Sequence, residues 1–385
     1  MKVLMIHNDY LELGGEYFSV RSEAEGLRAA GVDVELLLAS NSQIAESNLW
    51  QKVTALTLQR DAYGLVSDAI DRYKPDLVHA QNLFPALGAG AIRALADAGI
   101  PWVRTLRNYR LACIGGDFRL DGDDCYLCES SARAHAGVRR RCYRDSRTQS
   151  IGAVAYARAE RRASASHQPS AYLVLSRWMV SALQPVLDGV TVHVHPNIVP
   201  TASVAPAPKS ERRFAAAFVG RLASNKGPDF VIEVAALRPD LQFAIAGSGP
   251  LAKQLETARP NVKLLGEISH PEALKLMANS VATLVPSRWD EPFGRVAAEA
   301  LSVGTCPIVL ARGGLPDIVD GLDDSLVQAS LDPRQWAESL GTLCSLTDAR
   351  YSRLTEACIR VASERYSASA LTASLIRIYE TVLPR

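Results

Sequence analysis

The segment from Val281 to Gly304 constrains the fold more than any other part of this chain. An apolar run, Val281 to Val285, has the composition of a buried parallel strand. Gly294 then permits a tight turn, and the residue spacing becomes helical from Arg295 onward. Strand, loop and helix in this order form the repeating unit of a doubly wound parallel sheet, so the segment predicts an α/β fold.

The loop of this segment has the features of an anion-binding site. Pro292 holds Glu291 in an extended conformation at the end of the strand. We expect the free amides from Phe293 to Val296 to point out of a helix N-terminus, which attracts anions such as phosphate groups. Glu299 lies about 7.5 Å further along the helix, a distance that suits a carboxylate contacting a ribose. The alternative interpretation is an ordinary α/β unit with two surface acids.

Two motifs resemble those of family-4 GT-B glycosyltransferases, which are retaining enzymes that use sugar nucleotides. The first is the E-x7-E signature that runs from Glu291 to Glu299, and the second is Gly-Arg-Leu-x-x-x-Lys-Gly at residues 220–227. The resemblance covers nearly the whole chain. It implies two Rossmann-like doubly wound domains that face a cleft, with a C-terminal helix crossing back to the first domain.

The length of 385 residues suits this two-domain arrangement, and composition sets the boundaries. We expect an N-terminal acceptor-binding domain at 1–198 with a cysteine-rich insert at 107–145. A proline-containing linker at 199–212 leads to a nucleotide-sugar-binding domain at 213–366, and residues 367–385 form the returning helix. Strands are expected at 2–7, 32–38, 75–80, 103–106, 171–175 and 191–195, and then at 214–219, 243–246, 262–265, 281–285 and 306–310.

Arg221 and Lys226 follow a strand and a glycine, in the form of a diphosphate clamp. A solvated basic loop is the alternative. The resemblance assigns catalytic roles to Glu291, Arg221 and Lys226, to which we add Arg107. It assigns donor binding to Gly14, Gly15, Gly220, Arg221, Lys226, Gly247, Glu267, Ile268, Glu291, Phe293, Gly294, Arg295 and Glu299. For the Gly14–Gly15 loop, a plain turn is the alternative.

The chain departs from the family where Gln81 and Arg107 replace histidines. A guanidinium cannot shuttle protons near pH 7, but it can clamp a carboxylate or phosphate. We therefore expect Arg107 to meet an anionic group on the donor or the acceptor. A structural ion pair is the other interpretation.

Four of the seven cysteines gather in the insert: Cys113, Cys125, Cys128 and Cys142. One C-x-x-C pair with two flanking cysteines can form a four-thiolate zinc site. Free thiols and disulfides are the alternatives. We expect the chemistry itself to need no metal, so any zinc would be structural.

Residues 131–163 carry nine arginines against Asp145 and Glu160. Such a run is usually a solvated face, but it can also lie on anionic lipid or hold a phosphorylated acceptor. The net charge of +1 does not favour nucleic acid. The chain has no apolar run of about 18 residues, no leader and an odd number of cysteines, so we expect a cytoplasmic protein. If the arginine face binds lipid, we expect contact with the inner face of the membrane.

The sequence thus predicts a glycosyltransferase that moves a sugar from UDP or GDP to a hydroxyl of a glycan, glycolipid or small metabolite, as in polysaccharide biosynthesis. Loss of the family histidines leaves two alternatives: a non-catalytic sugar-nucleotide-binding protein, and a GT-B epimerase or hydrolase. The sugar, the base, the acceptor and the oligomeric state are not determined by the sequence.

Overall fold

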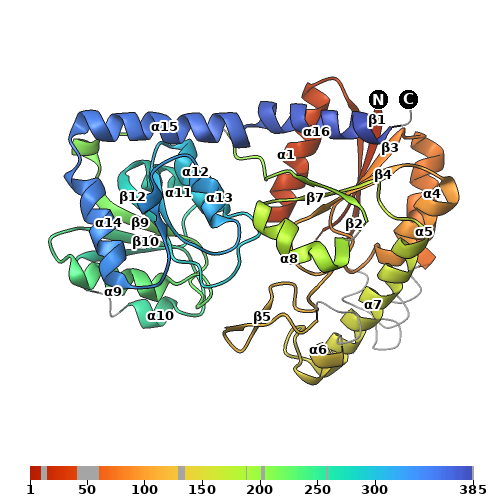
Figure 1. The fold of residues 1–385 in the computed structure, drawn as a ribbon, viewed down its shortest axis with the longest axis horizontal. Coiled ribbons are helices and arrows are strands. Elements are labelled where there is room, and N and C mark those ends of the chain that lie inside the picture. The colour runs from red at the N-terminus through yellow and green to blue at the C-terminus, as the bar shows by residue number, and fades with distance from the viewer. Residues whose placement is uncertain are drawn as a thin grey trace. The chain divides into compact units, whose positions relative to one another are not determined.

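The computed structural model describes residues 1–9, 15–40, 60–128, 135–187, 189–200, 204–256 and 259–383. The chain forms two compact units. Unit 1 comprises Met1–Ile198 and Leu371–Arg385, and unit 2 comprises Val199–Ala370 (Figure 1). Each unit contains a six-stranded sheet in which all paired strands run parallel, so the α/β expectation is confirmed.

The sheet of unit 1 has the strand order β2-β1-β3-β4-β7-β8. The order reverses between β1 and β3, and ligands of doubly wound folds bind beyond the carboxyl ends of strands at such a switch point. The strands are β1 (Lys2–Asp9), β2 (Asp33–Ser40), β3 (Leu77–Ala80), β4 (Trp102–Leu106), β7 (Ala171–Val174) and β8 (Thr191–Val194).

Helices cover both faces of this sheet because its central strands are apolar on both sides. One core contains Val66 of α4, Leu95 of α5 and Ala163 of α7. The other contains Leu27 of α1 and Tyr379 of α16, so the C-terminal helix packs within unit 1. The helices of unit 1 are α1 (Gly15–Ala29), α4 (Arg60–Tyr73), α5 (Gly88–Ala98), α6 (His135–Arg139), α7 (Arg147–Ser166), α8 (Arg177–Leu187) and α16 (Ala368–Val382).

The cysteine-rich insert has a small core of its own. A short antiparallel hairpin, β5 (Arg119–Leu120) with β6 (Asp123–Asp124), precedes α6. Ile114 and Cys128 pack against Ala153, Val154 and Ala157 of α7. The polar, turn-rich sequence gives little strand signal, and we did not expect this hairpin.

Unit 2 has the strand order β11-β10-β9-β12-β13-β14, which is the Rossmann order with its switch point between β9 and β12. Its strands are β9 (Phe214–Val219), β10 (Phe243–Ala246), β11 (Val262–Gly266), β12 (Ser280–Val285), β13 (Cys306–Leu310) and β14 (Val327–Gln328). The expected strands agree with these bounds within a residue, except that the two-residue β14 was not expected. The helices are α9 (Pro228–Leu237), α10 (Ala252–Leu255), α11 (His270–Ala278), α12 (Arg295–Ser302), α13 (Leu315–Val319), α14 (Pro333–Ser345) and α15 (Asp348–Tyr366).

Candidate functional site

Lys226 and Glu291 meet at the switch point of unit 2. They lie on the loops that follow β9 and β12, and these strands are neighbours in the sheet. The Nζ of Lys226 lies 2.5 Å from Oε1 of Glu291, and the Ser287 hydroxyl donates to the same oxygen at 2.6 Å. The ammonium also lies 5.1 Å from the ring centroid of Trp289. Both charged groups are therefore held in place by groups of unit 2.

Arg288, on the loop after β12, forms hydrogen bonds with the loop after β9. Its backbone N–H donates to the carbonyl of Asn225 at 2.8 Å, and its guanidinium donates to the carbonyl of Ser224 at 3.0 Å. The same guanidinium forms a two-pronged ion pair with Asp229, at 2.9 and 2.7 Å. Arg288 was not among the residues that sequence reasoning selected, because an arginine beside a Trp-Asp pair belongs to no motif that we recognised.

Two glycine contacts bring backbone close to the carboxyl edge of this sheet. Gly247, after β10, has φ +140°, and a Cβ there would overlap the carbonyl oxygen of Gly220. Gly313 has φ +55°, and a Cβ there would overlap the backbone of Glu291. Both positions require glycine, since other residues add a Cβ and disfavour positive φ.

Glu299 is buried within α12 and accepts two hydrogen bonds on one oxygen. Arg295 Nε lies 2.8 Å from Oε1, and His270 Nε2 lies 3.0 Å from it. Burial alone would raise the pKa of Glu299, but the hydrogen bond from His270 and the charge of Arg295 hold that pKa below its ordinary value. Glu299 is therefore an anionic acceptor, as contact with ribose hydroxyls requires.

The other predicted donor-site residues take varied positions. Gly294 is the N-cap of α12 with φ +103°, and Arg221 is exposed on the loop after β9. The Phe293 ring is buried 5.5 Å from the ring of Tyr366, so only its backbone is left to meet a ligand. Glu267 and Ile268 follow β11, and Gly15 begins α1, whereas Gly14 lies outside the described residues.

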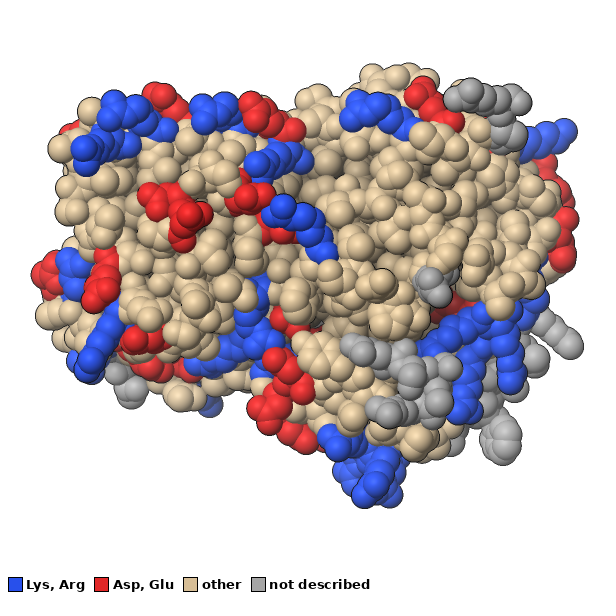
Figure 2. Space-filling view, in the orientation of Figure 1, with Lys and Arg blue, Asp and Glu red and all other residues tan. Residues whose placement is uncertain are grey.

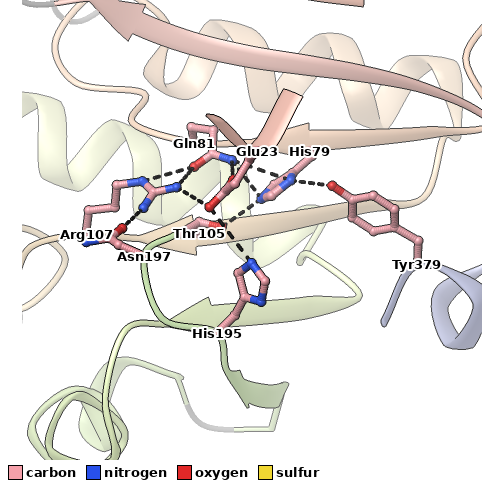
Figure 3. Close-up of polar contacts among 8 residues, drawn as sticks. All are labelled: Glu23, His79, Gln81, Thr105, Arg107, His195, Asn197 and Tyr379. Atoms are coloured by element: carbon pink, nitrogen blue, oxygen red, sulfur yellow. Dashed lines mark hydrogen bonds and ion pairs between the residues drawn. The ribbon is translucent and has the colours of Figure 1, made fainter. Parts of the chain in front are cut away.

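Arg107 does not have the free guanidinium that an anion clamp needs. Figure 3 shows it inside a buried polar cluster of unit 1. Its Nη2 lies 2.6 Å from Glu23 Oε1 and 3.0 Å from Gln81 Oε1, and its Nη1 donates to Asn197. The expectation that Arg107 meets a substrate anion is therefore corrected: Glu23 of α1 supplies its counter-charge, and the pattern of the sequence did not reveal that partner.

His79 completes this cluster in its neutral form. Its Nε2 lies 2.7 Å from the Thr105 hydroxyl, and its Nδ1 lies 2.6 Å from the hydroxyl of Tyr379 on α16. Burial lowers the pKa of His79 to about 3, and burial together with Arg107 lowers the pKa of His7 to about 4. Arg107 and His79 thus belong to one buried hydrogen-bonded network, in which Gln81 Nε2 donates to Glu23 Oε2 at 2.7 Å.

The four insert cysteines are all described, and they are not arranged as a zinc site. Within the described ranges, no three or more His, Cys, Asp or Glu side chains form a group that could hold a metal ion. All four thiols are free, with Cys113 and Cys128 buried. Burial, followed by the neighbouring thiols, raises the pKa of Cys142 to about 11. The structure therefore does not show the expected four-thiolate zinc site, which stays a prediction, and apolar residues form the core of the insert.

Two family models cover most of the chain. "Glycosyl transferase 4-like domain" matches residues 14–197, and "Glycosyl transferases group 1" matches residues 202–359. Among curated relatives, the D-inositol 3-phosphate glycosyltransferase of Mycolicibacterium gilvum is 37% identical over 152 residues, which are 36% of this chain and 33% of that protein. The corresponding Mycolicibacterium vanbaalenii protein is 35% identical over 158 residues, 36% of this chain and 35% of its own. The match thus spans about a third of the length of these relatives.

Solved structures agree on the fold. Sucrose-phosphate synthase from Thermosynechococcus elongatus superposes with a TM-score of 0.69 at 15% identity, over 99% of this chain and 98% of its own. The Anabaena protein HepE, solved with UDP and glucose, gives 0.63 at 16% identity, over 99% and 100%. The chain has the GT-B fold, and it contains a glycosyl transferase 4-like domain followed by a glycosyl transferase group 1 domain.

Proposed function

We propose that this glycosyltransferase moves a sugar from UDP or GDP to a hydroxyl group, with retention of configuration. The observation that carries the proposal is the meeting of Lys226 and Glu291 at the switch point of the unit 2 sheet, with α12 beginning at Arg295 on the loop that carries Glu291. This position is where doubly wound sheets bind nucleotides. UDP is the first donor to test, because HepE was solved with UDP-glucose.

The chemistry follows from the charges on these loops. A nucleoside diphosphate leaves readily, so the main task is to stabilise the negative charge that develops on its phosphates. The ammonium of Lys226, the exposed guanidinium of Arg221 and the amides at the start of α12 can do this. Glu291 would then hold hydroxyls of the sugar, and Glu299 those of the ribose.

Retention fits a site with a single carboxylate near the sugar. A double displacement through a covalent sugar needs two carboxylates about 5 Å apart. Glu291 is the carboxylate that the Lys226 ammonium contacts, whereas Glu299 is engaged by His270 and Arg295. We therefore propose attack of the acceptor on the face from which the diphosphate leaves.

Two measurements test this function. Titration calorimetry with UDP and GDP should reveal nucleotide binding to the wild-type chain. Proton NMR of the product formed from a panel of sugar nucleotides should then give the anomeric configuration of the donor sugar. No binding of either nucleotide would overturn the proposal, and an inverted product would overturn its stereochemical part.

We also propose that the arginine-rich face of α6 and α7 contacts anionic lipid. Figure 2 shows Lys and Arg side chains gathered there. The exposed arginines are Arg139, Arg140, Arg141, Arg144, Arg147, Arg158 and Arg162. Ile151 of α7 is 51% exposed among them, which gives the face an apolar contact as well. Within the part of the chain that the structure describes, no helix has the length and hydropathy to cross a bilayer.

A further inference from the structure

Two adjoining pockets of unit 1 contain more positive than negative charge. They share Phe84, Arg110, Leu111 and Glu160 in their walls. One extends to Arg104 in the middle of β4, and the other extends to Arg161 of α7. All the residues that line the pockets belong to unit 1. We treat them as one arginine pocket.

A single carboxylate opposes three arginines in the arginine pocket. Glu160 forms an ion pair with Arg104. Arg110 donates to the carbonyl of Ile114 at 3.4 Å, and Arg161 donates to the carbonyl of Leu111 at 3.3 Å. The fourth guanidinium in the wall, that of Arg107, is neutralised by Glu23 as described above. The hydrogen-bond partners of Arg110 and Arg161 in the pocket are therefore carbonyl groups, and Glu160, which is paired with Arg104, is the carboxylate that also acts on the charge of Arg161.

Several N–H groups of these arginines have no acceptor. Arg104 is only 6% exposed, and both its Nε and its Nη1 lack a hydrogen-bond partner among the described side chains and backbone. The Nε atoms of Arg110 and Arg161 are buried and equally without one. Burial also lowers the pKa of Arg161, which is the expected result when a charge is desolvated without full compensation. Buried charged donors of this kind call for an anion.

The packing of Arg110 fixes the direction of its guanidinium. The group lies 4.3 Å from the ring centroid of Phe84 and 5.4 Å from that of Tyr143. A planar guanidinium stacked on an aromatic ring presents its N–H edge in one plane, which suits the two oxygens of a carboxylate or phosphate. The ring contacts hold Arg110 in this orientation before any ligand arrives.

We propose that the arginine pocket binds an anionic group, a carboxylate or a phosphate, carried by the acceptor. That the ligand is the acceptor rests on the proposed function, whereas the anion site itself rests only on the geometry of unit 1. Arg104 and Arg161 would donate to the oxygens, and Arg110 would orient them. The acceptor would therefore be a charged molecule, such as a uronic acid or a phosphorylated polyol, rather than a neutral glycan.

The test measures anion binding to the full chain with UDP at saturation, so that phosphate cannot occupy the donor site. Inorganic phosphate and glucuronate are titrated separately at constant ionic strength in chloride. Arg161→Gln is compared with Arg377→Gln, which removes an exposed arginine of α16 in the same unit. We expect the wild type and Arg377→Gln to bind one anion equally, and Arg161→Gln to bind it at least about tenfold more weakly, as the loss of a charged hydrogen bond implies.

The anion that binds more tightly indicates whether the arginine pocket takes a phosphate or a carboxylate of the acceptor. Arg110→Gln is the second variant if Arg161→Gln does not fold, as judged by circular dichroism, and the same loss is expected. Wild-type affinity in these variants, or no binding of either anion, would overturn the proposal. Failure to bind UDP in the wild type would instead overturn the donor assignment in unit 2, so the two failures can be told apart.

Discussion

The Lys226 ammonium and the Glu291 carboxylate lie 2.5 Å apart across two loops of unit 2, although 65 positions separate them in the chain. Each group is the counter-charge of the other. An incoming diphosphate would compete for the ammonium, and an incoming sugar would offer hydroxyls to the carboxylate. The ion pair therefore keeps both side chains ordered in the positions where a donor would meet them.

Replacing Lys226 with alanine should lower the turnover number at least roughly tenfold, which corresponds to about 1.4 kcal/mol of lost transition-state stabilisation. The reason is that the departing diphosphate loses its nearest cation. Steady-state kinetics with the preferred sugar nucleotide give the number. Lys275→Ala, which removes an exposed lysine of α11, is the control and should retain wild-type rates. Unchanged turnover in Lys226→Ala would refute the clamp.

Glu299→Ala should weaken the binding of UDP about 10- to 100-fold, because a charged acceptor of ribose hydroxyls is worth roughly 1.5–3 kcal/mol. Inorganic diphosphate has no ribose, so its affinity should change little. Calorimetric titration of both ligands measures the difference. Equal losses for UDP and diphosphate would show that Glu299 only supports the local fold of α12.

Arg107→Met should destabilise the protein by about 3–5 kcal/mol, because it leaves Glu23 buried and unpaired. Urea unfolding measures the loss. The double variant Glu23→Leu with Arg107→Met removes both charges and should recover a large part of that stability. If the loss of unfolding free energy in the double variant equals the sum of the losses in Glu23→Leu and Arg107→Met, the two residues do not interact energetically.

Acid should destabilise the chain between pH 6.5 and pH 4. The native pKa of His7 is about 4 and that of His79 about 3, whereas an unfolded histidine titrates near 6.5. The unfolded chain therefore binds more protons in this range, and stability falls as the pH falls. The carboxylate of Glu23 acts in the same direction, because its depressed pKa stabilises the fold only above that value.

The pKa of His270 is shifted upward, in the opposite direction to the pKa values of His7 and His79. The hydrogen bond to Glu299 raises the pKa of His270, so its contribution is present below pH 6.5 and is lost as the pH rises through the native value. The urea concentration at the midpoint of unfolding should still decrease from pH 7 through pH 5.5 to pH 4.5. The decrease should be smaller in the His7→Asn variant. His193→Gln is the control. A midpoint that does not change with pH would contradict the role of the buried histidines.

Vesicles test the arginine-rich face of α6 and α7. Co-sedimentation with phosphatidylglycerol vesicles at low salt should exceed that with neutral vesicles, since each basic residue near an anionic surface contributes about 1 kcal/mol. The triple change of Arg139, Arg140 and Arg141 to glutamine should remove most of the difference. Equal sedimentation with both vesicle types would rule out electrostatic docking at this face.

The sequence predicted the fold and the strand-loop-helix segments of unit 2 because both depend on local patterns. Apolar runs followed by glycine turns identified the strands of unit 2, and the motifs around Lys226 and Glu291 lie within single strand-loop-helix segments. The carboxyl ends of parallel strands meet at one edge, so these two residues come together as the topology requires. The short strands β14 and β5–β6 carry too few residues to produce a periodic signal.

The environment of Arg107 could not be predicted in the same way. Glu23, Gln81 and Asn197 come from a helix and two loops that only the folded sheet brings together. The pattern of the sequence gives the type of residue that replaced a histidine, but not whether its charge is already balanced. The burial of Arg161 escaped notice for a different reason, because the run of arginines at residues 131–163 indicated a solvated face.

Gly313 lies on a turn that contributes no side chain, yet it leaves room for the main chain of Glu291. A methyl group added there would displace the carboxylate that we assign to the sugar, without touching any ligand. Attempts to alter donor preference by randomising residues around the nucleotide should therefore leave this turn unchanged. Inactivating substitutions at Gly313 would otherwise be mistaken for evidence of direct contact with the substrate.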